Sequence, residues 1–358
     1  MTLMNVFKTQ KLAFPQIYLL GANMNMQRWF SAVVLVLLFF VVTGCSVNPV
    51  SGKKEFVMMS EQQEVSLGAG LHKQVVQKYR PYNNAALQAY VNQIGQMLAS
   101  KSHRNKIPYH FLVVDDPGIN AFALPGGYIY ITRGLMAYLN SEAELAGVLA
   151  HEIGHVTARH SARQHTRSTV TKVLASVVAN KYGNAQAINT VATATIRGYG
   201  RDHELEADRL GAEYLARSGY DPKNMIRVIE VLKAQEQFSK MLARSEGRQP
   251  PSYHGLFSTH PSNDKRLHQV VGAANVQRQG NRPDNQQAYL RRLSGLKYNK
   301  DSKTTGQIKI ITARSGDTYA SLARRSGIPK LAEYKIRLLN GDFPKGEPRP
   351  GRLIKVVQ

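Results

Sequence analysis

Residues 151–155 read His-Glu-Ile-Gly-His, and these residue types at this spacing suit metal-assisted hydrolysis. The pentapeptide lies in a stretch, 141–160, that opens with a capping signal and has apolar residues at helical spacing, so we expect a helix there. Positions four apart on a helix are separated by about 40° and about 6 Å, so His151 and His155 can reach one tetrahedral ion. Glu152 lies beside them, where a general base can take a proton from a metal-bound water.

The pattern specifies only three residues, so the stretch could instead be a surface helix with two solvated histidines. A third metal ligand decides between these interpretations. The metzincin class would need a glycine at position 158 and a histidine at position 161, where the chain has Ala158 and Ser161. That class is therefore excluded, and His160 is out of phase with the other two histidines.

A second amphipathic helix, expected over 201–219, offers carboxylates instead. It opens with Arg-Asp-His-Glu-Leu-Glu-Ala-Asp, in which Glu204 and Asp208 lie four apart and share a face. One carboxylate can bind the metal while the other accepts a hydrogen bond from a ligand imidazole, an arrangement that zinc sites favour. The sequence therefore predicts a metal site shared by two helices.

Together the two motifs resemble those of the gluzincin family of the CAAX prenyl proteases and HtpX, in particular its periplasmic lipoprotein branch typified by BepA and LoiP. Residues 48–53, 120–127 and 258–261 also match that branch. The resemblance implies an α+β fold that is mainly helical, with a small β-sheet edge beside the zinc helix. It also implies one Zn²⁺ per chain, and it assigns the third ligand to Glu204 rather than Glu206.

The substrate side of the site is expected at a sheet edge. Residues 109–115 and 127–132 are rich in β-branched and aromatic residues, which predicts neighbouring strands. In the family that the chain resembles, 120–127 forms the edge that faces the substrate, although an ordinary hairpin is the alternative. The residues that complete the expected site are Asp208 and Arg201 beside the ligands, and Asn120, Gly126 and Gly127 on the substrate side.

His260 is a further candidate catalytic residue, on a loop that follows the second metal motif and ends at Pro261. Its imidazole could donate a hydrogen bond to the oxyanion that forms during hydrolysis. It could instead occupy the open position of the zinc ion until substrate displaces it, as relatives with a Thr-His-Pro motif suggest, and we favour this gating role. A structural histidine that caps the following helix is the third interpretation.

The N-terminal part of the chain has the pattern of a secretion signal. The apolar run 32–42 is too short for a comfortable bilayer span, and it leads to Val-Thr-Gly-Cys, which resembles a bacterial lipobox. We therefore expect residues 1–44 to be a signal peptide, with translation starting at Met24 or Met26, and Cys45 to be lipidated. The alternative for Cys45 is a lone buried thiol at the end of a membrane anchor.

The chain is strongly basic, with a formal charge of +23. Removing residues 1–44 takes away three basic residues and no acidic one, which leaves +20. Such a charge favours an anionic partner, and an exported chain makes nucleic acid a poor candidate. We expect a periplasmic protein that its lipid holds at the outer membrane, with peptidoglycan as a further partner.

Composition divides the rest of the chain. Residues 45–59 are expected to form a tether, 60–274 the zinc metallopeptidase domain, and the polar stretch 275–306 a linker. Residues 307–358 follow the βααβ order of a LysM-type module, which binds polymers of N-acetylglucosamine. A small structural cap is the alternative for this last unit.

These features predict a zinc-dependent metalloendopeptidase that hydrolyses misfolded or misassembled envelope proteins. The substrate class comes from the resemblance, not from the spacing of the motifs. Two alternatives stay open: an envelope assembly chaperone whose zinc is mainly structural, and a peptidoglycan-associated hydrolase. The presence of Glu152 disfavours the first, and the second motif around Glu204 disfavours the second.

Overall fold

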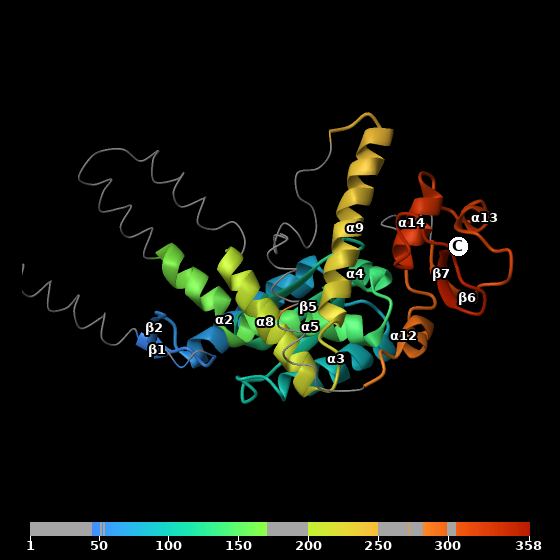
Figure 1. Ribbon diagram of the computed structural model, residues 1–358. Coiled ribbons are helices and arrows are strands. Elements are labelled where there is room, and N and C mark those ends of the chain that lie inside the picture. Colours follow the sequence, from blue (N-terminus) through green and yellow to red (C-terminus); the bar gives the residue numbers. More distant parts are fainter. Residues whose placement is uncertain are drawn as a thin grey trace, which may run out of the picture.

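The computed structural model describes residues 45–50, 52, 54–169, 200–249, 272, 282–298 and 306–358. Over these residues the chain is mainly helical with small sheets, as the α+β prediction required (Figure 1). The expected signal peptide and His260 lie outside the described residues. No helix in the described ranges has both the length and the apolar character that a bilayer span needs.

A three-stranded sheet lies at the centre of the peptidase region. Its strands are β3 (His110–Val114), β4 (Ala121–Leu124) and β5 (Tyr128–Thr132), in the order β3-β5-β4. The parallel pairing of β3 with β5 confirms the predicted neighbouring strands, and β4 runs antiparallel to β5. The helices of this region are α2 (Glu61–Lys78), α3 (Ala85–Ala99), α4 (Arg133–Tyr138), α5 (Glu142–Thr157), α8 (Arg201–Arg217) and α9 (Asn224–Ser245).

The helix α5, which carries both histidines, is the centre of the core. The Ser141 hydroxyl caps its first turn by accepting a hydrogen bond from the Glu144 amide, 3.1 Å away. The Glu144 carboxylate accepts a hydrogen bond from the Asn140 amide (2.7 Å). Every residue of α5 after its first is buried, which agrees with its apolar sequence, because a helix that is apolar on all sides needs neighbours on all sides.

Close packing of α5 against α8 sets the distance between the two metal motifs. A Cβ atom on Gly154 would lie 2.8 Å from the Ala207 carbonyl oxygen, and one on Gly211 would lie 3.1 Å from the His151 backbone nitrogen. These glycines therefore allow the two backbones to approach more closely than larger residues would permit.

Buried ion pairs hold the C-terminal end of α5. Arg104 donates to the Val156 carbonyl (2.9 Å) and to the Glu64 carboxylate on α2 (3.1 Å). Arg159 donates to the same carboxylate (2.8 Å). Ser60 and Gln63 form a capping box at the start of α2, so this helix presents Glu64 in a fixed place.

The segment expected as a tether contains a β-hairpin. Strands β1 (Cys45–Val47) and β2 (Lys54–Phe56) pair antiparallel, with Cys45 opposite Phe56. The Met58 amide then donates to the Thr166 hydroxyl (3.1 Å), which joins this segment to the helical residues that follow α5.

The C-terminal unit packs on the peptidase region and has the element order β-α-α-β (Figure 1, orange to red). It has a small core of its own around Tyr319 and Ile336. Other side chains of the unit, Leu338, Leu339 and Val357, belong to the core that contains α5. The elements of the unit are β6 (Ile308–Thr312), α13 (Tyr319–Ala323), α14 (Ala332–Leu339) and β7 (Leu353–Val357), and α12 (Gln286–Arg292) precedes it in the stretch expected to be a linker.

Two glycine-to-alanine changes should have opposite effects on stability. Gly154→Ala places a Cβ against Ala207 and should lower the free energy of unfolding by about 1–3 kcal/mol. Gly70→Ala, on α2 with open space around it, should raise it by roughly 0.5–1 kcal/mol. Urea unfolding measures both. A Gly154→Ala protein as stable as the wild type would show that the α5–α8 contact is not tight.

Candidate zinc centre

Three buried side chains from two helices converge on one point. His151 and His155 come from α5 and Glu204 from α8, and one ligand atom of each lies within 4.8 Å of the others. The two Nε2 atoms are 3.0 Å apart. The Glu204 carboxylate oxygens lie 3.6 Å from Nε2 of His151 and 3.5 Å from Nε2 of His155.

These separations fit a zinc ion. Donors at the corners of a tetrahedron with bonds of about 2.0–2.1 Å are about 3.3 Å from each other, close to all three distances here. Two imidazoles and one carboxylate leave a fourth position open, as in catalytic zinc sites. Burial also suits a ligand set: Glu204 is fully buried and His155 is 1 % exposed, and a buried carboxylate needs a positive partner.

Asp208 orients the first histidine. Its Oδ1 lies 2.9 Å from Nδ1 of His151, on the side of the ring away from the three ligand atoms. A carboxylate there holds the proton on Nδ1 and leaves Nε2 free for the metal. The four-residue spacing thus lets Glu204 act as a metal ligand while Asp208 orients the ligand His151.

His160 orients the second ligand histidine, His155. The position of His160 in the helical repeat did not predict this role. Nδ1 of His160 lies 2.8 Å from Nδ1 of His155, and Nε2 of His160 lies 3.0 Å from the Glu206 carboxylate. Metal binding through Nε2 of His155 places its proton on Nδ1, which then donates to His160. The remaining proton of His160 points at Glu206, so the order of donors and acceptors is consistent throughout.

The surroundings of the hydrogen bonds that link His155, His160 and Glu206 favour this arrangement of protons. Burial lowers the pKa of His160 and therefore favours the neutral ring. Although partial burial acts in the opposite direction, the hydrogen bond from His160 and the nearby Arg163 lower the pKa of Glu206 to about 2. Burial likewise lowers the pKa of His203 to about 3, and this ring stacks on His160 with centroids 4.2 Å apart.

Comparison with known proteins places these residues in a family. The family model "Peptidase family M48" matches residues 85–274, more than half of the chain, and that span contains all three converging ligands. The chain belongs to peptidase family M48. Members of this family are zinc metallopeptidases, and the two histidines and the glutamate of this chain can hold one metal ion.

Relatives of this M48 chain are named proteases. It is 33% identical over 233 residues to the beta-barrel assembly-enhancing protease of Escherichia coli (strain K12), which covers 62% of this chain and 45% of that protein. It is 35% identical over 179 residues to the mitochondrial metalloendopeptidase OMA1 of Arabidopsis thaliana, covering 50% of this chain and 34% of that protein. The chain thus spans less than half the length of these relatives.

The other expected site residues of this M48 domain occupy different surroundings. Glu152 is buried, 1 % exposed, on the α5 turn that carries His151. Gly126 and Gly127 have positive φ angles in the turn between β4 and β5, and they are packed against α2 and Pro108. Arg201 is exposed at the first position of α8. Contact between the two glycines, or the partly buried Asn120, and a substrate stays a prediction.

Two glutamates of the second motif should respond differently to substitution. Glu204→Gln should abolish zinc binding, because it replaces a charged ligand. Glu206→Gln should lower zinc affinity about 10- to 100-fold while one ion still binds at saturation, because it removes the partner of His160. Competition with a chromophoric chelator measures both, with the exposed Asp202→Asn as the control on the same helix. Equal loss of zinc in the two glutamate variants would contradict the assignment.

Proposed function

We propose that this chain is an envelope protease that cleaves extended or misfolded polypeptides at the zinc centre of α5 and α8. The observation that carries the proposal is the convergence of His151, His155 and Glu204 beside a glutamate, Glu152, that is not part of the ligand set. A structural zinc site uses all four positions for protein ligands, whereas a hydrolytic one keeps a position open.

The roles of the side chains follow from where they lie. His151, His155 and Glu204 would hold zinc, which when bound supplies Lewis acidity to polarise a carbonyl and acidify water. Glu152, next to His151 on the same helix, would take the proton of the attacking water and pass it to the leaving amine. Burial of Glu152 strengthens its interaction with charge that develops in the transition state, because little water competes.

The two edges of the sheet beside α5 differ in what their backbone groups bind. On the β3 edge, the Gln88 side chain donates to the Val113 carbonyl (2.8 Å) and accepts from the Val113 amide (2.9 Å). The Gln96 side chain donates to the Tyr109 carbonyl (2.8 Å). Side-chain amides from α3 thus occupy the backbone groups of that edge, as a neighbouring strand would.

The β4 edge is the one that we assign to the substrate. The Thr132 amide donates to the Asn120 carbonyl (3.0 Å), so by the alternation of an antiparallel ladder Ala121 and Ala123 direct their backbone groups away from β5. No strand among the described residues pairs with β4 on that side. Ala121 and Ala123 are buried, so an extended peptide would have to displace what covers them before it pairs there by main-chain hydrogen bonds, which depend little on its sequence. Such binding suits unfolded substrates.

The names of the relatives bear on the cellular setting of the proposed protease. Bacterial relatives named beta-barrel assembly-enhancing proteases favour outer-membrane or periplasmic proteins as substrates, and mitochondrial relatives favour quality control at a membrane. We further propose lipidation at Cys45, anchorage at the outer membrane, glycan binding by residues 307–358, and gating by His260. A chaperone with a structural zinc is the second candidate, which the buried Glu152 disfavours.

Glu152→Gln should leave zinc bound and lower kcat by a factor of at least about 100, because the amide cannot accept and return a proton. Metal analysis and cleavage of an unfolded protein such as casein, on one preparation, test this. The exposed Glu230→Gln on α9 is the matched control. Near-normal proteolysis by Glu152→Gln would refute the base assignment, and an inactive wild-type protein with zinc bound would favour the chaperone.

Two proline substitutions test the substrate edge. Ala123→Pro removes an outward amide hydrogen and should weaken cleavage of long unfolded substrates while the protein stays folded, because edge strands tolerate proline there. Phe122→Pro removes an inward hydrogen bond to β5 and should instead lower the melting temperature. Steady-state kinetics and thermal unfolding separate the two effects. Unchanged KM and kcat in a folded Ala123→Pro protein would exclude β4 as the binding edge.

A further inference from the structure

A lysine of the last strand is buried in the peptidase region. Lys355, at the middle of β7, has no solvent exposure. Its Nζ donates to the Ala137 carbonyl (2.8 Å) and to the Leu139 carbonyl (2.7 Å). These carbonyls lie at the end of α4 and in the short connection to α5, so the C-terminal unit inserts an amine donor just before the zinc helix.

The surroundings of the Lys355 amine act on its charge in opposite directions. The C-terminal end of a helix carries partial negative charge on its unpaired carbonyls, and Lys355 binds there at the end of α4. Glu144, in the first turn of α5, raises the pKa of Lys355, while the larger effect of burial lowers it to about 7. A buried lysine is costly to retain for stability alone, which points to a specific use.

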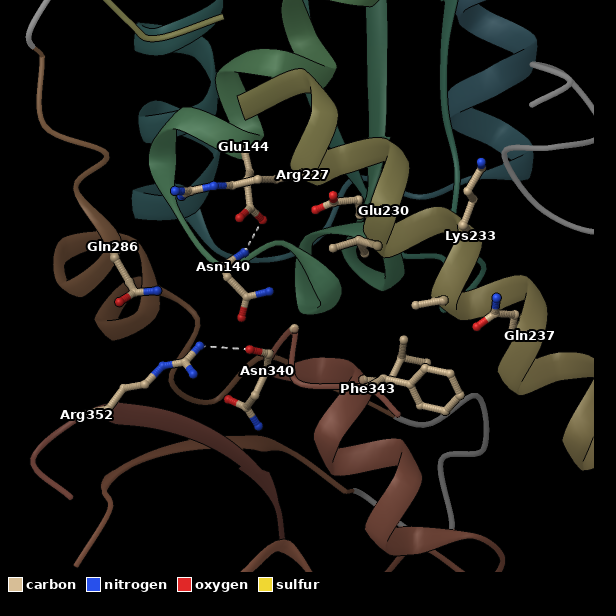
Figure 2. Close-up of a pocket in the computed structure, with 14 residues that line it drawn as sticks. Asn140, Glu144, Arg227, Glu230, Lys233, Gln237, Gln286, Asn340, Phe343 and Arg352 are labelled. Carbon is tan, nitrogen blue, oxygen red and sulfur yellow. Dashed lines mark hydrogen bonds between the residues drawn. The ribbon is translucent and has the colours of Figure 1, made fainter. Parts of the chain in front are cut away.

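The turn after α14 adds a second contact at the same place. The Asn340 side chain accepts from the Lys355 amide and donates to the Lys355 carbonyl, both at 2.8 Å, and so fixes the backbone of that residue. Figure 2 shows Asn140 and Glu144 facing Asn340 and Arg352 across a polar cleft of about 540 Å³ bounded by α9. The start of α5 therefore forms one wall of the junction between the two units.

Another lysine holds the same junction through aromatic rings and not through those two carbonyls. Lys335, on α14, lies over the rings of Phe238 (4.7 Å), Tyr138 (4.9 Å) and Tyr298 (5.9 Å). This contact is a cation–π arrangement between the C-terminal unit, α4 and α9. Replacing Lys335 therefore weakens docking of the unit, whereas replacing Lys355 also removes the contact with the Ala137 and Leu139 carbonyls.

We propose that Lys355 is a positioning residue of the protease, through which the C-terminal unit fixes the start of the zinc helix and hence the placement of Glu152 and the ligands. This inference rests on the proposed peptidase function. His151 lies ten residues beyond the cap of α5, about 15 Å along a rigid helix, so a small tilt at the first turn displaces the site. Misplacement by about 1 Å can cost roughly 100-fold in rate.

The test compares Lys355→Met with Lys335→Met in the full chain. Both variants lose a buried interaction between the units, so both should lower the melting temperature. Lys355→Met alone should lower kcat about tenfold or more with little change in KM, because the β4 edge is untouched. It alone should also alter the visible absorption spectrum of the cobalt-substituted protein, which reports ligand geometry without turnover.

The outcomes separate this proposal from a purely structural role. If Lys355→Met matches Lys335→Met in both kcat and cobalt spectrum, the positioning role is refuted, whatever the melting temperatures. If Lys355→Met does not fold, Lys355→Gln, whose amide can still donate to one carbonyl, is compared with Lys335→Met by the same criteria. If the wild type cleaves nothing, the proposed peptidase function fails, and the cobalt spectra alone decide the role of Lys355.

Discussion

The close packing of α5 against α8 is the contact on which the rest of the structure depends. Two histidines on one helix supply only part of a zinc site, and the third ligand must come from a helix about 50 residues further along the chain. Gly154 and Gly211 bring the backbones close enough for Glu204 to meet both Nε2 atoms at 3.5–3.6 Å. The same helix contact places Asp208 next to His151 and Glu206 next to His160. One packing contact thus positions both the ligands and the groups that orient them.

The turn that ends α5 combines strain with function. Arg159 has a φ of 56°, a left-handed conformation that costs roughly 1–2 kcal/mol for a residue with a side chain. Its ion pair with the buried Glu64 and its bond to the Met59 carbonyl (2.5 Å) offset that cost. Because the helix is interrupted there, the next residue, His160, departs from the phase of α5 and lies against His155. The strained residue therefore stands immediately before a group that orients a ligand.

Local signals in the sequence predicted the elements of the site and its two histidines, whereas the resemblance to a family supplied Glu204 as the third ligand. The helix of the first motif, its cap at Ser141 and the strands around Ile129 all depend on residues near one another in the chain. His160 was set aside because its phase on an uninterrupted helix is wrong, and only the left-handed turn at Arg159 makes it useful. Lys355 gave no signal at all, since neither periodicity nor charge pattern indicates which distant carbonyls a strand residue meets.

The zinc helix is held at three points by three parts of the chain. Arg104 binds its last turn at the Val156 carbonyl, α8 packs along its middle, and the C-terminal unit binds the segment before its cap. The Val156, Ala137 and Leu139 carbonyls accept hydrogen bonds at the two ends, and a buried acceptor that loses its partner costs more than its bond contributes. Loss of either of these supports therefore leaves unpaired carbonyls beside a helix whose position sets the metal geometry. A unit that looks accessory in sequence is, by this reasoning, part of the frame that the site requires.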